Sequence, residues 1–199
     1  MIYTILFSLI KGVSINIKKK LIDESINAES AFLKLRDDLK KINTVSSNKI
    51  LNQINSISLL NDAEKIIKNC NDNNIKLVSY KDIGYPKNLF HCIDAPIVLY
   101  CKGKMEPNKY NLISIVGTRN CSDYGLDQCK ELINFLKPYN IAIVSGLAYG
   151  IDVFAHNRAN SLGIANYAVL GSGINNIYPK AHLKESEIIS NNGMLISEF

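Results

Sequence analysis

From residue 112 onward, short apolar segments alternate with longer segments of helical spacing, and this alternation strongly constrains the fold. The apolar segments are rich in β-branched residues, which favour strands. Repeated strand–helix–strand units predict an α/β fold with a parallel sheet, and right-handed crossovers are expected to place helices on both of its faces. The expected strands are 112–117, 141–145, 167–171 and 193–197, and the expected helices are 124–136, 151–162 and 181–190.

Turns rich in small residues follow three of these strands: GTRN (117–120), SGLAYGID (145–152) and GSGINNIYPK (171–180). The carboxyl ends of parallel strands lie at one edge of the sheet, and Rossmann-like folds bind ligands there. The sequence therefore predicts a single site for a phosphate-bearing ligand, built from all three turns.

The first turn has groups that suit an anion. Gly117 allows the backbone to approach a ligand, Thr118 offers a hydroxyl, and the guanidinium of Arg119 matches phosphate oxygens in a bidentate manner. A glycine turn beside a surface arginine would have the same sequence, so both interpretations stay open.

The second turn opens a helix, whose positive end favours an anion. Asp152, in the first turn of that helix, is expected to support the loop because its carboxylate would repel a phosphate. His156, four residues later, either forms an acid–base pair with Asp152 or is a buried, hydrogen-bonded histidine. The donors expected from this turn are Ser145, Gly146, Leu147 and Ala148.

The third turn places a lysine where a helix dipole disfavours it, which suggests that Lys180 meets an anion. The rings of Tyr124, Tyr149 and Tyr178 have the shape to stack on bases, although tyrosines equally often pack against the protein. The ligand-binding residues expected from this turn are Gly171, Ser172, Gly173, Tyr178 and Lys180.

Composition and known motifs exclude several classes of site. The net charge of +5 is weak support for nucleic-acid binding, because the chain is biased toward Lys, Asn and Ile. The five cysteines show no metal-ligand or disulfide pattern, so we expect no metal and a cytoplasmic protein. The first ten residues are too short to span a bilayer, and we expect no membrane association. The chain has no P-loop and no GxGxxG, and therefore no cofactor is expected.

Residues 1–65 have apolar residues at helical spacing and are predicted to form a small all-helical domain of the SAM or helix-hairpin-helix type. The glycine turn at Gly12 resembles such a hairpin, although Ser14 stands where a second glycine is usual. Both DNA contact and a role in packing or partner binding stay open for it. Residues 75–199 are expected to form the Rossmann-like domain.

The ordered turns resemble those of the DNA-processing protein A family (DprA, also called Smf). Its pattern is a GSR-type turn, then SGLAxGID with a downstream histidine, then GSG followed by YP. The segment YPKNLFHCIDAPIVLYCKG (85–103) is similar to the family's lead-in segment, so the resemblance covers about residues 75–199.

The resemblance implies a non-enzymatic protein that binds single-stranded DNA in natural transformation, protects it and helps to load the RecA recombinase. It also implies a homodimer. The phosphate contacts that it implies are Gly117, Thr118, Arg119, Ser145, Gly146 and Lys180.

Three positions depart from the family pattern. Thr118 replaces a serine, Tyr149 stands where many members carry arginine, and His182 stands where asparagine is common. The chain stops at SEF, whereas the family's domain continues, so we expect the C-terminal part of the Rossmann-like domain to be missing and an edge of the sheet to be open.

Two other functions use the same fold. A phosphoribohydrolase would carry a PGGxGT loop with a nearby glutamate, and this chain has no such string. A sensor of a small nucleotide needs the same phosphate-binding turns as a DNA-binding protein, and the sequence does not separate the two.

Overall fold

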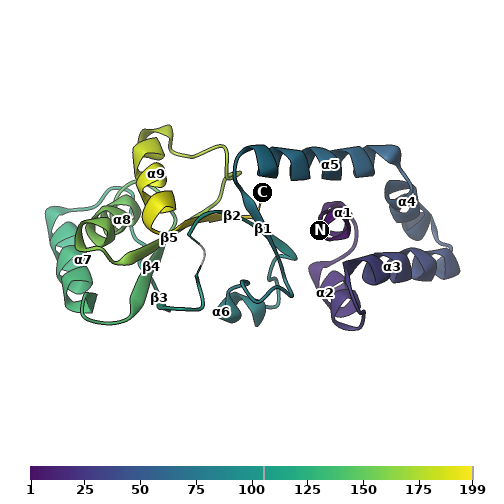
Figure 1. Cartoon of the computed structure of the whole chain (residues 1–199), viewed down its shortest axis with the longest axis horizontal. Helices are drawn as coiled ribbons and strands as arrows, with labels where there is room; N and C mark the ends of the chain where they lie inside the picture. Colours follow the sequence, from purple (N-terminus) through teal and green to yellow (C-terminus); the bar gives the residue numbers. More distant parts are fainter. Residues whose placement is uncertain (105, 199) are drawn as a thin grey trace. The chain divides into compact units, whose positions relative to one another are not determined.

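The computed structural model describes residues 1–104 and 106–198 and divides into two compact units. The first unit consists of Met1–Asp82 and Lys87–Val98, and the second of Ile83–Pro86 and the chain from Leu99 onward (Figure 1). Residues 75–82 and 87–98, which we expected in the Rossmann-like domain, thus lie in the first unit. The domain bounds of 1–65 and 75–199 stay a prediction.

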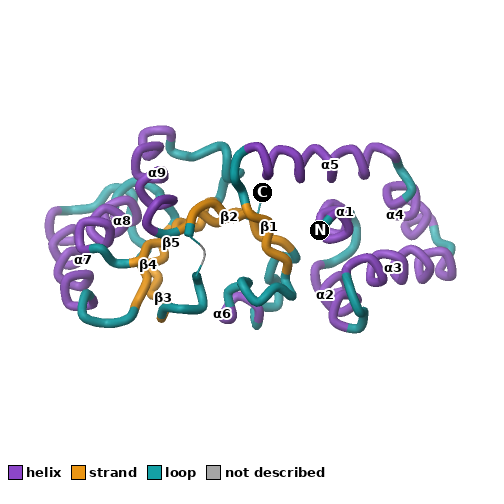
Figure 2. Tube along the Cα trace, viewed as in Figure 1, coloured by secondary structure: helices purple, strands orange, loops and turns teal. Residues whose placement is uncertain are grey.

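The first unit is mainly helical (Figure 2). Four of its described helices begin where a side chain satisfies a free backbone N–H group: Ser14, Asn27, Thr44 and Ser56 each accept from the amide three residues later. Their apolar faces enclose a core that includes Ile5, Phe7, Ala31 and Phe32. The elements are α1 (Ile2–Leu9), α2 (Ile15–Asp23), α3 (Ala28–Ile42), α4 (Val45–Ile54), α5 (Ile57–Asp72), β1 (Lys76–Ser79) and α6 (Lys87–Phe90).

The turn between α1 and α2 is held by α4. Gly12 has φ of 85°, and the Gln53 side chain accepts from the Lys11 amide at 3.1 Å and donates to the Lys11 carbonyl at 3.4 Å. Ser14 accepts from the Ile17 amide at 3.4 Å and caps α2. The backbone groups of Lys11 therefore stabilise the unit itself.

Three consecutive lysines in α2 also interact within the first unit. The ammonium of Lys18 is buried and donates at 2.7 Å to the carbonyl of Ile10, the residue that ends α1. Lys19 donates to the carbonyl of Cys92 at 2.6 Å, and Lys20 forms an ion pair with the glutamate four residues on. These lysines therefore do not form one solvated face.

The second unit contains a mixed sheet in which strands lie in the order β2-β6-β5-β4-β3. β3, β4, β5 and β6 are parallel, and β2 is antiparallel to β6. The elements are β2 (Val98–Gly103), β3 (Asn111–Ser114), α7 (Asp123–Leu136), β4 (Ile141–Ser145), α8 (Ile151–Leu162), β5 (Ala165–Leu170), the 3₁₀ helix η1 (Lys180–His182), α9 (Leu183–Asn192) and β6 (Met194–Ser197).

The predicted α/β class and Rossmann-like connections are confirmed, but the predicted helices on both faces are not found among the described residues of this unit. Each crossover from β3 to β6 steps in the same direction across the sheet, so right-handed connections put every connecting helix on the same face. α8 accordingly packs between α7 and α9 (Figure 1). The antiparallel direction of β2 was not predicted.

The helix-covered face of the sheet forms the core of the second unit. Ile143 of β4, Ile133 of α7, and Ala155 and Ala159 of α8 are fully buried in one cluster. Small residues on α8 allow the helix to lie close to the strands. Among the described residues, no helix combines the length and the apolar character needed to cross a bilayer.

Candidate phosphate-binding pocket

A pocket of about 270 Å³ lies where the three small-residue turns meet, after the carboxyl ends of β3, β4 and β5. The three turns predicted to form one site therefore do contribute to one concave surface. The residues that line the pocket are Arg119, Gly146, Ala148, Tyr149, Gly171, Ser172, Tyr178 and Pro179.

Asp152 joins the first two turns. Its Oδ1 accepts from the Gly117 amide at 3.4 Å and its Oδ2 from the Gly146 amide at 3.1 Å, and its side chain is buried. The amide of Ile151 donates in addition to the carbonyl of Thr118. The two turns are thus held together by hydrogen bonds from the start of α8, and the amides of Gly117 and Gly146 already have an acceptor.

Two glycines allow this close approach of the turns. Gly150 has φ of 78°, and a Cβ there would collide with the carbonyl oxygen of Thr118. A Cβ on Gly117 would lie 2.7 Å from Cγ1 of Ile151. Larger residues at either position would push the first turn away from α8.

Arg119 is the charged residue of the pocket, and none of the described lining residues is acidic. The hydroxyl of the preceding Thr118 is engaged within its own turn, since it accepts from the amide of Asn120 and donates to its carbonyl, both at 3.2 Å. The guanidinium is therefore the group of the first turn that is suited to neutralise an anion in the pocket.

Gly171 and Ser172 supply the third side of the pocket. A Cβ on Gly171 would meet no atom within 4 Å, so packing within the described protein does not require glycine here. The carbonyl of Ser172 accepts from the Ser197 hydroxyl at 2.7 Å, which ties this turn to the end of β6. The turn thus combines a fixed backbone with open space above Gly171.

Tyr149, whose ring was considered from the sequence as one that could stack on a base, lines the pocket, and so does Pro179, which was not among the expected ligand-binding residues. The Tyr149 ring makes an edge contact with the ring of His182, with centroids 4.9 Å apart. Nδ1 of the buried His182 lies 2.8 Å from the carbonyl oxygen of Leu147, so this nitrogen is the donor. The tyrosine ring is therefore supported by a histidine that is itself held by the second turn. In the sequence, this pair could have been noticed because positions 149 and 182 both depart from the family pattern.

The remaining expected residues lie outside the lining. Ser145 is buried and its hydroxyl donates to the Ile115 carbonyl at 2.6 Å, and Leu147 is fully buried with φ of 57°. Both therefore serve the fold in this structure. Lys180 is exposed at the start of η1, next to the lining residue Pro179. The expected residues within the lining are Arg119, Gly146, Ala148, Gly171, Ser172 and Tyr178, and those outside it are Gly117, Thr118, Ser145, Leu147, Gly173 and Lys180.

His156 is hydrogen-bonded to Asn166 of β5. Its Nδ1 lies 2.5 Å from the Asn166 side-chain oxygen, and the side-chain Nδ2 of Asn166 donates to the His156 carbonyl at 3.0 Å. The ring is fully buried, and this burial lowers the pKa of His156, which favours the neutral form. The carboxylate oxygens of Asp152 accept from backbone amides, so the geometry favours a buried structural histidine over an acid–base pair.

The profile of a family described as DNA recombination-mediator protein A matches residues 76–199. The chain belongs to this family. Among its relatives, the DNA processing protein DprA of Streptococcus pneumoniae is 37% identical over 121 residues, which are 61% of this chain and 43% of that protein. DprA of Bacillus subtilis is 30% identical over 154 residues, or 73% of this chain and 52% of the relative. Protein Smf of Escherichia coli is 34% identical over 116 residues, which are 58% of this chain and 31% of that protein. The chain thus spans between about a third and about a half of these relatives.

Solved structures of the family have the same fold. DprA of S. pneumoniae matches with a TM-score of 0.81 and 28% identity over 100% of this chain and 68% of that chain. DprA of Helicobacter pylori, whose structure concerns its single-stranded DNA binding mode, matches with a TM-score of 0.54 and 27% identity over 62% of this chain and 56% of that chain. The resemblance stated from the sequence is therefore confirmed.

Proposed function

We propose that this chain binds the backbone of single-stranded DNA at the pocket formed by the three turns. The observation that carries the proposal is one concave surface that combines the guanidinium of Arg119, the small residues Gly171 and Ser172, and the rings of Tyr149 and Tyr178. A cation meets phosphate, small residues permit close approach, and aromatic faces stack on bases without regard to sequence.

The proposal also assigns the chain a place in DNA recombination during natural transformation. There it protects an incoming strand and helps to load the RecA recombinase, in the cytoplasm, as a homodimer and without catalysis. Membership of a recombination-mediator family supports this assignment. So does the H. pylori relative, whose structure concerns single-stranded DNA binding.

The test is fluorescence anisotropy with a labelled single strand and the matching duplex over a salt series. The variant Arg119→Gln removes the pocket's charge, and Arg158→Gln removes a charge at the contact between α7 and α8, where Arg158 bonds to Asn134. We expect the single strand to bind better than the duplex. Arg119→Gln is expected to weaken binding by at least about tenfold, because a charged hydrogen bond contributes about 1.5–3 kcal/mol and about 1.4 kcal/mol is a factor of ten. It is also expected to reduce the salt slope by about 0.7, the value for one phosphate contact.

Arg158→Gln is expected to keep the affinity within about twofold and the slope unchanged. Salt-insensitive binding, or binding by Arg119→Gln equal to that of the wild type, would reject the pocket as the DNA site.

A sensor of a small nucleotide is the second candidate function, favoured by the size of the pocket. Its volume of about 270 Å³ is close to the lower end of the range of about 300–1,000 Å³ for small-molecule sites. Calorimetry with nucleoside monophosphates separates the two functions: a sensor binds the mononucleotide more tightly than the oligonucleotide. Release of free base in the same samples would instead indicate a phosphoribohydrolase.

A further inference from the structure

The ring of Tyr149 packs on a ring from another turn and still reaches the pocket. Tyr149 lines the pocket and is 47% exposed, and the planes of its ring and that of His182 are 69° apart. In such a contact, one ring presents its edge to the face of the other. Whichever ring supplies the edge, His182 leaves at least one face of the Tyr149 ring uncovered. The pocket therefore has an aromatic face for a ligand.

His182, at the end of η1, is itself held in place. The residue is buried, and its Nδ1 donates to the carbonyl oxygen of Leu147 at 2.8 Å. Leu147 is fully buried and lies two residues before Tyr149 in the same turn. The imidazole thus connects η1 to the turn that carries the tyrosine, and close packing leaves it little freedom to move.

The backbone on both sides of Tyr149 is also fixed. The carbonyl of Ala148 accepts from the amide of Val153 at 3.1 Å, and that of Gly150 accepts from the next amide along the chain at the same distance. Both donors belong to the first turn of α8. Ring and backbone of Tyr149 are therefore positioned before a ligand binds. A side chain held in this way loses little conformational freedom on binding, which favours affinity.

Arg119 and Tyr149 line the same pocket and suit different parts of a nucleotide. The guanidinium suits a phosphate, whereas an aromatic ring stacks on a base. Contact with the backbone alone would not need a ring held in one orientation. Positions 149 and 182 both depart from the family pattern, so the pair distinguishes this chain from many members. The positioned ring therefore indicates a nucleotide that enters with its base.

We propose that the pocket recognises a base through Tyr149, and that His182 is a positioning residue that holds the tyrosine ring for stacking. The base of one nucleotide of the strand lies on this ring, while a phosphate faces Arg119. Because every base has a face that can stack, binding depends on the presence of a base and not on its identity. This assignment rests on the proposed function at the pocket and adds the base to the part of the ligand that is recognised.

The test compares two labelled single strands of equal length by fluorescence anisotropy, one with thymine at every position and one that is abasic throughout. The full chain is expected to bind the thymine strand at least about fivefold more tightly, the lower end of what stacking of one base contributes. Tyr149→Leu is expected to reduce this preference by at least about fivefold. Tyr149→Phe, which returns a ring without the hydroxyl, is expected to restore it.

Two substitutions at His182 separate its ring from its hydrogen bond. His182→Asn keeps a side-chain N–H for the Leu147 carbonyl and removes the ring on which Tyr149 packs. It is expected to reduce the preference at least about twofold, the cost of ordering one side chain on binding. His182→Phe restores a ring without the donor and is expected to restore the preference, with a lower urea midpoint because a buried carbonyl loses its partner. A histidine that served the fold alone would change the affinity for both strands by the same factor.

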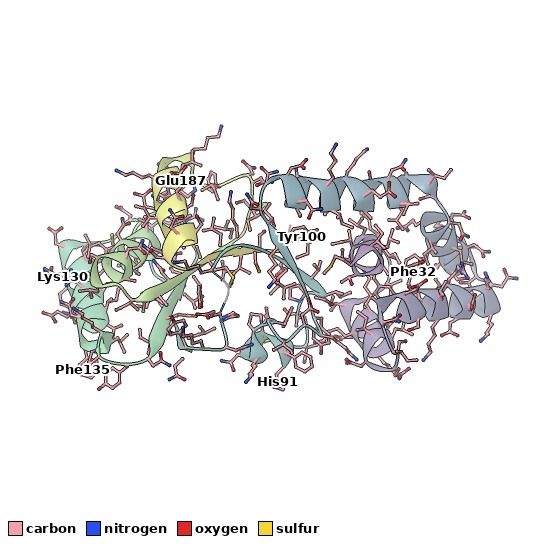
Figure 3. All side chains as sticks on the ribbon, in the orientation of Figure 1. Phe32, His91, Tyr100, Lys130, Phe135 and Glu187 are labelled. Atoms are coloured by element: carbon pink, nitrogen blue, oxygen red, sulfur yellow. The ribbon has the colours of Figure 1, made fainter. Side chains whose placement is uncertain are left out.

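Tyr139→Leu is the matched control outside the pocket lining. Tyr139 is 55% exposed, and its ring lies 5.8 Å from that of Phe135 of α7 (Figure 3). This variant is expected to keep the affinity for each strand within about twofold of the wild type. Arg119→Gln is expected to weaken both strands by the same factor, because they carry the same phosphates. Far-ultraviolet circular dichroism and the urea midpoint check that each variant is folded.

The results distinguish the base contact from the proposed function. If Arg119→Gln binds both strands as the wild type does, the pocket is not the DNA site and both proposals fail. If Arg119→Gln weakens both strands and the wild type binds them equally, only the base contact is overturned. Full preference for the thymine strand in Tyr149→Leu would also overturn it. An unchanged preference in His182→Asn would reject the positioning role of His182.

Discussion

A single carboxylate at the start of α8 determines how the first two turns of the pocket lie. Asp152 accepts an amide with each oxygen, from Gly117 and from Gly146. Because the side chain is buried, water does not replace either hydrogen bond when it is lost. The sequence indicated a supporting role for Asp152, and the geometry shows which atoms it supports.

Asp152→Asn is expected to lower the free energy of unfolding by about 1–3 kcal/mol, because one acceptor oxygen is replaced by an NH₂ that faces an amide donor. Urea unfolding measures the change. The control Asp62→Asn, at an exposed ion pair on α5, is expected to stay within about 0.5 kcal/mol of the wild type. Equal stability of both variants would contradict the bracing role of Asp152.

The buried ammonium of Lys18 makes stability depend on pH. Burial lowers the pKa of Lys18 from 10.5 to about 8, so between these values the unfolded state holds more protons than the folded state. The free energy of unfolding should therefore rise with pH across this window.

Urea unfolding between about pH 7.5 and 9.5 checks this expectation, with Lys18→Met as the comparison. The difference in unfolding free energy between wild type and variant should shift in favour of the wild type as the pH rises. The comparison between the two proteins cancels the titration of other groups. A difference that is independent of pH would show that Lys18 titrates as it does in the unfolded chain.

At the scale of elements, the start of α8 requires glycine at position 150 for two reasons, its positive φ and the lack of room for a Cβ. Gly150 before the helix and Gly163 after it have similar positive φ values of 78° and 71°. They differ in ψ, which is −127° at Gly150 and 20° at Gly163, and in their surroundings, because a Cβ at Gly150 collides with the carbonyl of Thr118 whereas nothing lies within 4 Å of one at Gly163.

Gly163→Ala is expected to destabilise the chain by about 1 kcal/mol, the conformational cost alone. Gly150→Ala adds a less favourable ψ and a steric clash and is expected to cost at least twice as much, about 2 kcal/mol or more. Thermal or urea unfolding of the pair provides the comparison. A similar loss of unfolding free energy in both variants would mean that, in Gly150→Ala, the first turn moves away from α8 without an energetic cost.

Local sequence patterns were sufficient to predict the strands and helices of the parallel sheet, but not which polar side chains form hydrogen bonds between these elements. The strand 141–145 and the helix 151–162 appear as expected, because β-branched runs and helical spacing are properties of neighbouring residues. The bond between His156 and Asn166 joins α8 to β5, and the Ser145 hydroxyl turns toward β3. Such contacts between elements decide whether a polar residue faces a ligand or the fold, and spacing alone leaves both open.

At the scale of the whole molecule, the net charge of +5 is a poor guide to where an anion binds. The lysine run of α2 interacts within the first unit: Lys18 with a backbone carbonyl, Lys19 with another, and Lys20 with Glu24. In the second unit, Arg119 lines the pocket, and none of the described lining residues is acidic. Position, rather than the total of basic residues, should therefore govern binding.

Lys20→Gln is accordingly expected to leave the affinity for single-stranded DNA within about twofold of the wild type, although it removes as much charge as Arg119→Gln. The same salt series measures it. A salt slope reduced by about 0.7 would instead show that the hairpin-like region of the first unit contacts a phosphate.

The open space above Gly171 has a consequence for selectivity. Since Gly171 lines the pocket and a Cβ here would meet no atom of the described protein within 4 Å, we expect a small side chain at this position to reduce the room for the ligand without a clash within the fold. A series from glycine through alanine to valine would therefore measure, in steps of one carbon atom or two, how closely a bound backbone passes the end of β5. Members of the family that differ at this one position should differ in the width of strand or nucleotide that they admit.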